Sequence, residues 1–219
     1  MESFRVCFTI LLIKSAAQLL AANTIDNQGI NSCFSYTPNR GWVNDPNGLV
    51  YAAGIYHLFY QHNPYSNEDT NISWGHATSP DLVNWTDKGV AILFNKTAQI
   101  QRFSGSAVVN STNAGCPAAG RRIVAIFTDA DNKTGTQAQS IAYSDDGITF
   151  KLYAGNPVIP SPPSQYASEY RNFRDPKVFW YEPKKTWLMV VVLSDIRKVL
   201  FYWSPNLLQW TYKGEFSSE

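Results

Sequence analysis

The sequence predicts an all-β protein built from repeated small antiparallel sheets. Aromatic residues make up 14% of the 219-residue chain, as 7 Trp, 12 Tyr and 12 Phe, and aromatic side chains favour strands. After residue 25, no stretch of useful length has the apolar periodicity of an amphipathic helix. Three similar segments also recur along the chain, which is the sequence signature of a repeat architecture.

The recurring segments are turns that close on an aromatic residue, at 79–85, 144–150 and 204–210. Their spacings are 65 and 60 residues, and their serine, proline, aspartate, asparagine and glycine residues favour turns. Each turn follows two apolar runs typical of strands, at 56–60 and 72–78, 123–128 and 140–143, and 187–193 and 198–203. We therefore expect three units of strand, connection, strand, turn and further strand, as in a β-propeller, with a β-sandwich as the alternative.

Residues 1–22 have the layout of a secretory signal peptide. Arg5 precedes the apolar run 6–13, and small residues follow, so we expect cleavage after Ala17 or after Ala22. The apolar run is too short to cross a bilayer, which takes about 20 apolar residues. The alternative for this segment is a buried N-terminal strand.

Five acceptor sequences for N-glycosylation agree with secretion. Such a density between residues 71 and 132 is typical of a glycosylated, extracellular surface. The acceptors are Asn71, Asn84, Asn95, Asn110 and Asn132. We therefore expect a secreted glycoprotein that makes no contact with the membrane once the signal peptide is removed.

Charge and cysteine usage exclude other classes of protein. With 18 basic and 17 acidic side chains, the chain lacks the basic excess that nucleic-acid binding requires, so we expect no nucleic-acid partner. Cys33 and Cys116 remain after removal of the signal peptide, and the sequence leaves open whether they pair. The cysteines and the three histidines show no spacing typical of metal ligands, so we expect no metal site.

Two aspartates in similar settings are candidates for chemistry. Asp45 follows Asn44 in the dense turn sequence 42–49, and the proline after it favours extended backbone at the aspartate. The alternative is an ordinary Asx turn. Asp175 is also followed by proline, and Arg174 beside it either holds the carboxylate ionised, reaches a substrate hydroxyl, or makes a structural ion pair.

Five motifs in a fixed order then give the chain a family resemblance. They are Trp42–Leu49, Gln61–Pro64, Trp74–His76, Phe103–Ala107 and Phe173–Pro176. In this order they resemble the N-terminal motifs of glycoside hydrolase family 32, the invertases, inulinases and related β-fructofuranosidases. The likeness runs from about Phe34 to the end of the chain and is strongest to secreted fungal exo-inulinases. Val43 is a departure, because the family commonly has methionine there.

The resemblance implies a five-bladed β-propeller followed by a β-sandwich. We therefore expect residues 23–219 to be an incomplete propeller catalytic domain of about three blades. On this interpretation two blades and the C-terminal sandwich are missing from this chain, which agrees with the three repeated units, since three units cannot close a ring.

The resemblance also implies retaining hydrolysis of terminal β-fructofuranosyl bonds in sucrose or fructans, without a cofactor. Asp45 matches the nucleophile of the family, and Asp175 matches its transition-state stabiliser. The positions that match the substrate pocket are Asn44, Gln61, Trp74, Phe103, Ser104 and Arg174.

The acid/base residue of the family is a glutamate in a Glu-Cys pair downstream of Arg-Asp-Pro. This chain has no such pair, and its glutamates after Asp175 are Glu182, Glu215 and Glu219. Because a retaining glycosidase needs both carboxyl groups, we expect the acid/base beyond the chain end and this chain alone to be inactive. The alternatives are a non-catalytic sugar-binding or truncated pseudoenzyme relative, and a fructosyltransferase.

Overall fold

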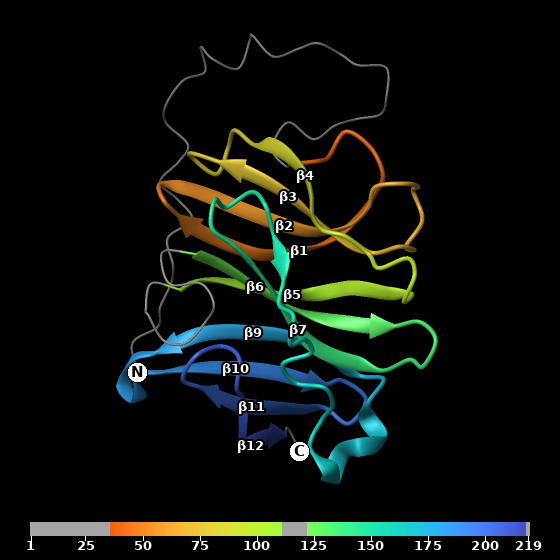
Figure 1. Cartoon of the computed structure of the whole chain (residues 1–219), viewed down its shortest axis with the longest axis vertical. Coiled ribbons are helices and arrows are strands. Elements are labelled where there is room, and N and C mark those ends of the chain that lie inside the picture. The colour runs from red at the N-terminus through yellow and green to blue at the C-terminus, as the bar shows by residue number, and fades with distance from the viewer. Residues whose placement is uncertain (1–35, 111–121, 218–219) are drawn as a thin grey trace. The chain divides into compact units, whose positions relative to one another are not determined.

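A computed structural model describes residues 36–110 and 122–217 of the chain (Figure 1). The predicted signal peptide and all three cysteines lie outside these residues. Within them, the secondary structure is strand apart from two short 3-10 segments, η1 (Ser164–Glu169) and η2 (Glu182–Lys184). The prediction of an all-β protein is confirmed.

The strands of the described residues form three four-stranded antiparallel sheets, each a meander of consecutive strands. The first sheet holds β1 (Trp42–Ala52), β2 (Ile55–Asn63), β3 (Ser73–Ser79) and β4 (Thr86–Ile92). The second holds β5 (Ile100–Asn110), β6 (Arg122–Asp131), β7 (Gln137–Ser144) and β8 (Lys151–Leu152). The third holds β9 (Phe173–Tyr181), β10 (Thr186–Leu193), β11 (Lys198–Ser204) and β12 (Thr211–Ser217). The three predicted repeat units are these three sheets.

The first strands of the three sheets lie next to one another. β1 contacts β5, and β5 in turn contacts β9, so the sheets follow one another in chain order, from orange and yellow through green to blue in Figure 1. Meanders arranged side by side in this way are blades of a β-propeller. The β-sandwich alternative is therefore wrong.

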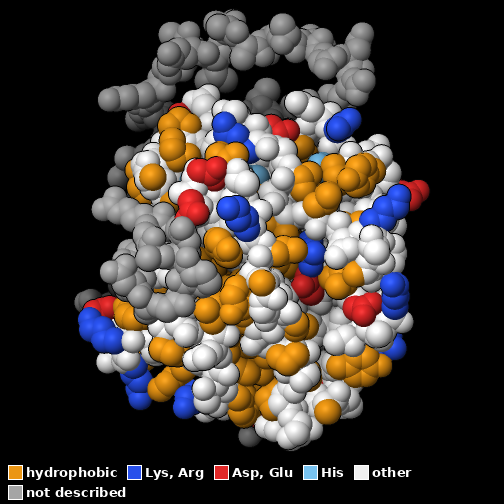
Figure 2. Space-filling view, in the orientation of Figure 1, with side chains coloured by type: hydrophobic (Ala, Val, Ile, Leu, Met, Phe, Trp, Pro, Cys, Tyr) orange, Lys and Arg blue, Asp and Glu red, His pale blue; other side chains and the backbone are white. Residues whose placement is uncertain are grey.

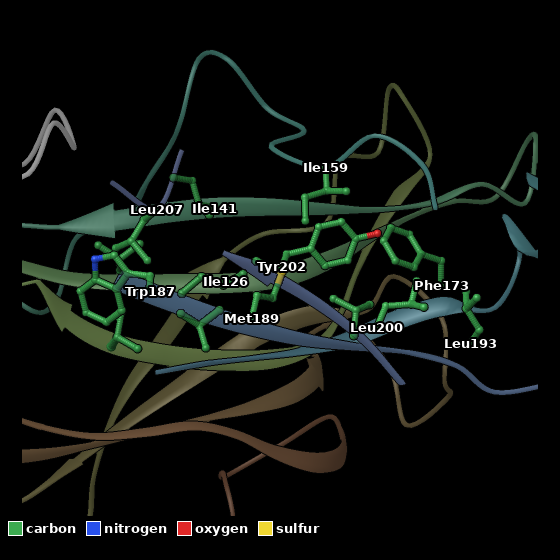
Figure 3. Close-up of a cluster of buried hydrophobic side chains, with 14 residues drawn as sticks. Ile126, Ile141, Ile159, Phe173, Trp187, Met189, Leu193, Leu200, Tyr202 and Leu207 are labelled. Carbon is green, nitrogen blue, oxygen red and sulfur yellow. The ribbon is translucent and has the colours of Figure 1, made fainter. Parts of the chain in front are cut away.

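Two apolar clusters fill the spaces between neighbouring sheets, and β6 contributes to both. Successive side chains of a strand point to opposite faces. Ile123, Ala125 and Phe127 accordingly join the cluster that contains Phe59 and Trp74. Val124 and Ile126, on the other face, join the cluster of Met189, Leu200 and Leu207 (Figure 3). The second sheet is thus packed on both faces.

The recurring turn has the same hydrogen bonds in each sheet. The serine that ends the third strand bonds the side chain two residues later, which is Asp81, Asp146 or Asn206. That side chain accepts hydrogen bonds from the backbone N–H groups two and three residues after it. In the first and third sheets the indole of Trp85 or Trp210 also donates to a backbone carbonyl within the turn. The turn is therefore a repeated structural closure.

The exposure of the five predicted glycosylation acceptors differs from one to another. Asn84, Asn95 and Asn132 are exposed and Asn71 is half-buried, whereas Asn110 is 0% exposed. This burial does not favour Asn110 as an acceptor, and its glycosylation stays a prediction like that of the other four. On the face shown in Figure 2, basic side chains lie scattered among acidic ones. No helix of the described residues is long and apolar enough to cross a membrane.

Candidate functional site

Each of the three adjacent first strands carries a β-bulge, where two residues face one residue of the partner strand. On β1, Asn44 and Asp45 together face Gln61. On β5, Phe103 and Ser104 face Thr128, and on β9, Asp175 and Pro176 face Val191. A bulge turns side chains away from the regular ladder and is frequent next to active sites. The three bulges carry most of the predicted site residues.

The sequence predicts a dense turn at 42–49, and this prediction is wrong. These residues belong to strand β1, which pairs with β2 on both sides of the bulge at Asn44–Asp45 and has a second irregularity between Asn47 and Val50. Asparagine, proline and glycine suit a bulged strand as well as a turn. Whether the segment is a turn or a bulged strand depends on its pairing with β2, whose partner residues lie up to Asn63.

Asp45 is held from the second sheet. The Ser104 hydroxyl donates to Asp45 Oδ2 over 2.6 Å, and the Gln61 side-chain amide donates to Ser104 Oγ over 2.8 Å. A hydroxyl has a single proton, so the bond from Gln61 leaves that proton directed at the carboxylate. Asp45 itself is exposed, while Gln61 and Ser104 are buried beneath it. The carboxylate is therefore fixed at one oxygen and accessible.

Asp175 lies close enough to Asp45 for the two carboxylates to interact electrostatically. Burial raises the pKa of Asp175; Arg174 opposes this shift, and the charge of Asp45 adds to it. Arg174 Nε is 3.8 Å from Asp175 Oδ2, and its guanidinium also donates to Asn172 over 3.1 Å. Arg174 therefore lowers the pKa of Asp175, which is the direction that holding the carboxylate ionised requires, but burial outweighs the arginine and the net shift is upward.

The remaining predicted pocket residues differ in exposure. Trp74 is completely buried, packs against Phe59 and Phe127, and donates its indole N–H to the Phe103 carbonyl over 2.9 Å. It thus supports the second bulge from beneath. Phe103 is half-buried, and Asn44 is exposed beside Asp45. The structure therefore brings the predicted site residues to one set of adjacent bulges.

The described glutamates that follow Asp175 lie elsewhere. Glu215 is in β12, the fourth strand of its sheet. Hydrogen bonds from Lys198 first, and then from Tyr166 and Tyr212, lower its pKa to about 2. Glu182 is in the turn between β9 and β10 and bonds Lys185. Glu219 lies outside the described residues. Neither described glutamate is on a first strand, and the low pKa of Glu215 is opposite to what a general acid needs.

Three buried residues that sequence analysis did not single out also connect the bulges. They are Asn47, Ser106 and Thr128. Asn47 accepts a hydrogen bond from the Gly105 N–H over 3.2 Å, while Ser106 and Thr128 bond the backbone around Asp175. What these residues share is their position next to or facing a bulge, and sequence analysis did not locate the bulges. No group of three potential metal-binding side chains occurs in the part of the chain that the structure describes.

The amino-acid sequence is similar to those of known proteins over almost its whole length. The sequence pattern described as "Glycosyl hydrolases family 32 N-terminal domain" matches residues 36–219. A levanase of Bacillus subtilis is 44% identical over 217 residues, which are 98% of this chain and 30% of that protein. Invertase 2 of Saccharomyces cerevisiae is 39% identical, over 97% of this chain and 40% of its own length.

The solved structures give the same picture. The crystal structure of the exo-inulinase from Aspergillus awamori superposes with a TM-score of 0.80 and 43% identity, over 85% of this chain and 40% of that one. A β-fructofuranosidase from Schwanniomyces occidentalis, in complex with fructosyl-erythritol, gives a TM-score of 0.75 at 40% identity, over 84% and 36%. The chain thus spans well under half the length of the proteins that it matches.

Proposed function

This chain belongs to family 32 of the glycosyl hydrolases, and we propose that it is the N-terminal part of a secreted β-fructofuranosidase. Relatives are named levanase, extracellular exo-inulinase and invertase, which supports terminal β-fructofuranosyl bonds of sucrose or fructans as the substrate. The observation that carries the proposal is the pair of carboxylates, Asp45 on the first bulge and Asp175 on the third, within electrostatic reach of each other.

Asp45 is the proposed nucleophile of a retaining, two-step reaction. Ser104 binds Oδ2 of this carboxylate, so we assign the attack to Oδ1. In the first step Oδ1 bonds to the anomeric carbon as the glycosidic bond breaks, and the general acid protonates the leaving oxygen. In the second step water, deprotonated by the same residue, releases fructose from the enzyme. We place that acid/base in a Glu-Cys pair beyond Glu219, in the full-length protein.

Asp175 is the proposed transition-state stabiliser. Its carboxylate would bind ring hydroxyls, and its negative charge would stabilise the positive charge that develops on the sugar. The charge of Asp45 raises the pKa of Asp175 in the free site. Formation of the fructosyl ester removes the Asp45 charge, so this repulsion disappears when the covalent intermediate forms.

The pocket for the terminal fructosyl unit is proposed to be shaped by side chains around the three bulges. Gln61 and Ser104 would combine a structural bond with contacts to the sugar, and Trp74 would act through Phe103, whose carbonyl it binds. The full proposed set is Asn44, Gln61, Trp74, Phe103, Ser104 and Arg174. Passage through a secretory pathway, with glycans on the exposed acceptors Asn84, Asn95 and Asn132, belongs to the same proposal.

The test of the nucleophile is Asp45→Asn in the full-length protein. We expect fructose release from sucrose to fall at least about 10⁴-fold, with unchanged expression and melting temperature because Asp45 is exposed. Asp69→Asn, at another exposed aspartate of the first sheet's loops, is the matched control. Wild-type turnover in Asp45→Asn would refute the assignment.

The second candidate is a non-catalytic sugar-binding relative, which would share the exposed Asp45 and the side chains that hold it. The transcript beyond the codon for Glu219 separates the two. A Glu-Cys pair there supports the hydrolase, and a stop codon directly after Glu219 supports the pseudoenzyme. Products formed at high sucrose concentration then distinguish a hydrolase from a fructosyltransferase, which would extend sugar chains instead of releasing fructose.

A further inference from the structure

We propose that Thr128 is a positioning residue for Asp175, and that its buried hydroxyl fixes the third bulge from the second sheet. The inference rests on the role proposed above for Asp175 and adds a residue that the resemblance did not assign. Thr128 is the residue that the second bulge faces. It lies in β6, which contacts β9.

The bulge leaves the backbone at Asp175 in need of support. Asp175 and Pro176 together face Val191, so Asp175 is outside the regular ladder with β10. Its φ is +63°, in the left-handed region that costs a non-glycine residue free energy. A residue stays in such a conformation only where its surroundings hold it there.

Thr128 supplies that support. Its Oγ1 accepts the Asp175 N–H over 3.1 Å and donates to Gln139 Oε1 over 2.8 Å. The Gln139 side-chain amide donates to the Phe173 carbonyl over 2.8 Å. Thr128 and Gln139 are both 0% exposed. Because the hydroxyl proton goes to Gln139, a lone pair of Oγ1 is left for the Asp175 N–H, and the segment from Phe173 to Asp175 is held at both ends.

Ser106 provides a second, independent anchor on the other side of the bulge. Its hydroxyl donates to the Pro176 carbonyl over 2.9 Å and accepts the Val178 N–H over 3.0 Å. This side chain, in β5, is also buried. Two hydroxyls of the second sheet therefore bind backbone groups before and after the bend that carries the Asp175 carboxylate.

A similar arrangement occurs between the first and second sheets, although there the residue that faces the bulge binds a side-chain hydroxyl of the next bulge instead of a backbone N–H. Gln61 faces the first bulge and reaches Ser104 in the second, just as Thr128 faces the second bulge and reaches Asp175 in the third. Asn47, two residues after its bulge, accepts the Gly105 N–H, and Ser106 holds the equivalent position in the second sheet. Equivalent positions in successive sheets thus bind the next bulge, which argues against a chance contact at Thr128.

The decisive variant is Thr128→Val in the full-length protein, which keeps the side-chain shape and removes the hydroxyl. We expect kcat for sucrose hydrolysis to fall about 10-fold to 100-fold, the loss typical of a misplaced reacting group, with KM changed less than kcat. Thr128→Ser keeps the hydroxyl and should restore kcat. Thr78→Val, at a threonine of β3 that is 8% exposed, is the matched control and should retain kcat.

A double-mutant cycle separates positioning from general destabilisation. In the Asp175→Asn background the carboxylate is already gone, so Thr128→Val should cost less than about twofold. Hydrogen exchange of the Asp175 amide gives a readout that needs no activity, and Thr128→Val should speed it about 10-fold. If Thr128→Val does not fold, because it leaves buried polar groups without partners, Thr128→Ala, which also removes the hydroxyl that binds the Asp175 amide, takes its place in each measurement.

The inference is overturned if Thr128→Val keeps both kcat and amide protection, if Thr128→Ser fails to restore them, or if the loss is the same in both backgrounds. Failure of the proposed function looks different. The wild-type protein would then release no fructose, while the amide-exchange comparison of Thr128→Val with Thr78→Val would still decide whether the Thr128 hydroxyl holds the bulge.

Discussion

The buried histidine pair of the first sheet predicts that acid destabilises the fold. His57 Nδ1 and His76 Nε2 are 3.1 Å apart, the two rings are stacked, and Phe59 stacks on His76. His76 is 1% exposed. Burial first, and then the charges of His57 and Lys88, lower its pKa from 6.5 to about 3.

The direction and size of the acid destabilisation follow from the difference between the His76 pKa in the folded and unfolded chains. The unfolded chain binds a proton at His76 near pH 6.5, whereas the folded chain binds it only near about pH 3. Stability from the neutral ring is therefore complete above the unfolded pKa and is lost as the pH falls towards the folded one. At about 1.4 kcal/mol per pH unit, the free energy of unfolding should fall by about 2 kcal/mol between about pH 7 and about pH 5. Burial also lowers the pKa of His57, which adds to the loss.

The assay is urea unfolding of the full-length protein at both pH values, for wild type and His76→Gln. The wild type should lose about 2 kcal/mol more than the variant on acidification, whatever their difference at neutral pH. His62→Gln is the control, because His62 is also buried in the first sheet but bonds the Trp42 carbonyl instead of another histidine. This variant keeps the His57–His76 pair, so its free energy of unfolding should fall on acidification as much as that of the wild type. Equal acid losses in wild type and His76→Gln would refute the reasoning.

Three further outcomes test other parts of the structure. Gly105→Ala should destabilise the fold by about 3 kcal/mol, seen as insoluble expression or a large fall in melting temperature, because a Cβ there would lie 2.0 Å from the Ile126 carbonyl oxygen. Asp146→Ala removes an acceptor of two backbone N–H groups and should lower the melting temperature by about 2–4 °C, or about 1 kcal/mol. Arg174→Met removes the charge that opposes the raised pKa of Asp175, so the acid limb of kcat/KM should move to higher pH in a pH–rate profile, and an unmoved limb would contradict this.

The second and third strands of each sheet could be predicted from sequence because their apolar runs and the following turn are local signals. The predicted runs 123–128 and 187–193, for example, lie within β6 and β10. The turns after them are recognisable because side chains such as Asp146 bond backbone groups only two or three residues away. Local chemistry of this kind survives in the sequence pattern.

The first strands and the site geometry could not be predicted in the same way. β1 contains the asparagine, proline and glycine of a turn, and only its register with β2 reveals a bulged strand. The raised pKa of Asp175 depends on burial and on Asp45, which is distant in sequence. The burial of Asn110 depends on packing that no acceptor motif encodes. Family resemblance supplied the site residues but not these contacts.

The contacts that pass from each sheet to the next bulge also set an order of events during synthesis. Asp45 leaves the ribosome 59 residues before Ser104, the partner that holds its carboxylate, and Thr128 leaves 47 residues before the Asp175 amide that it binds. Domains fold from the N-terminus as they emerge. Each completed sheet therefore presents polar groups whose partners belong to the following sheet. A nascent chain that pauses between sheets leaves these groups exposed to solvent at the place where the proposed site will form.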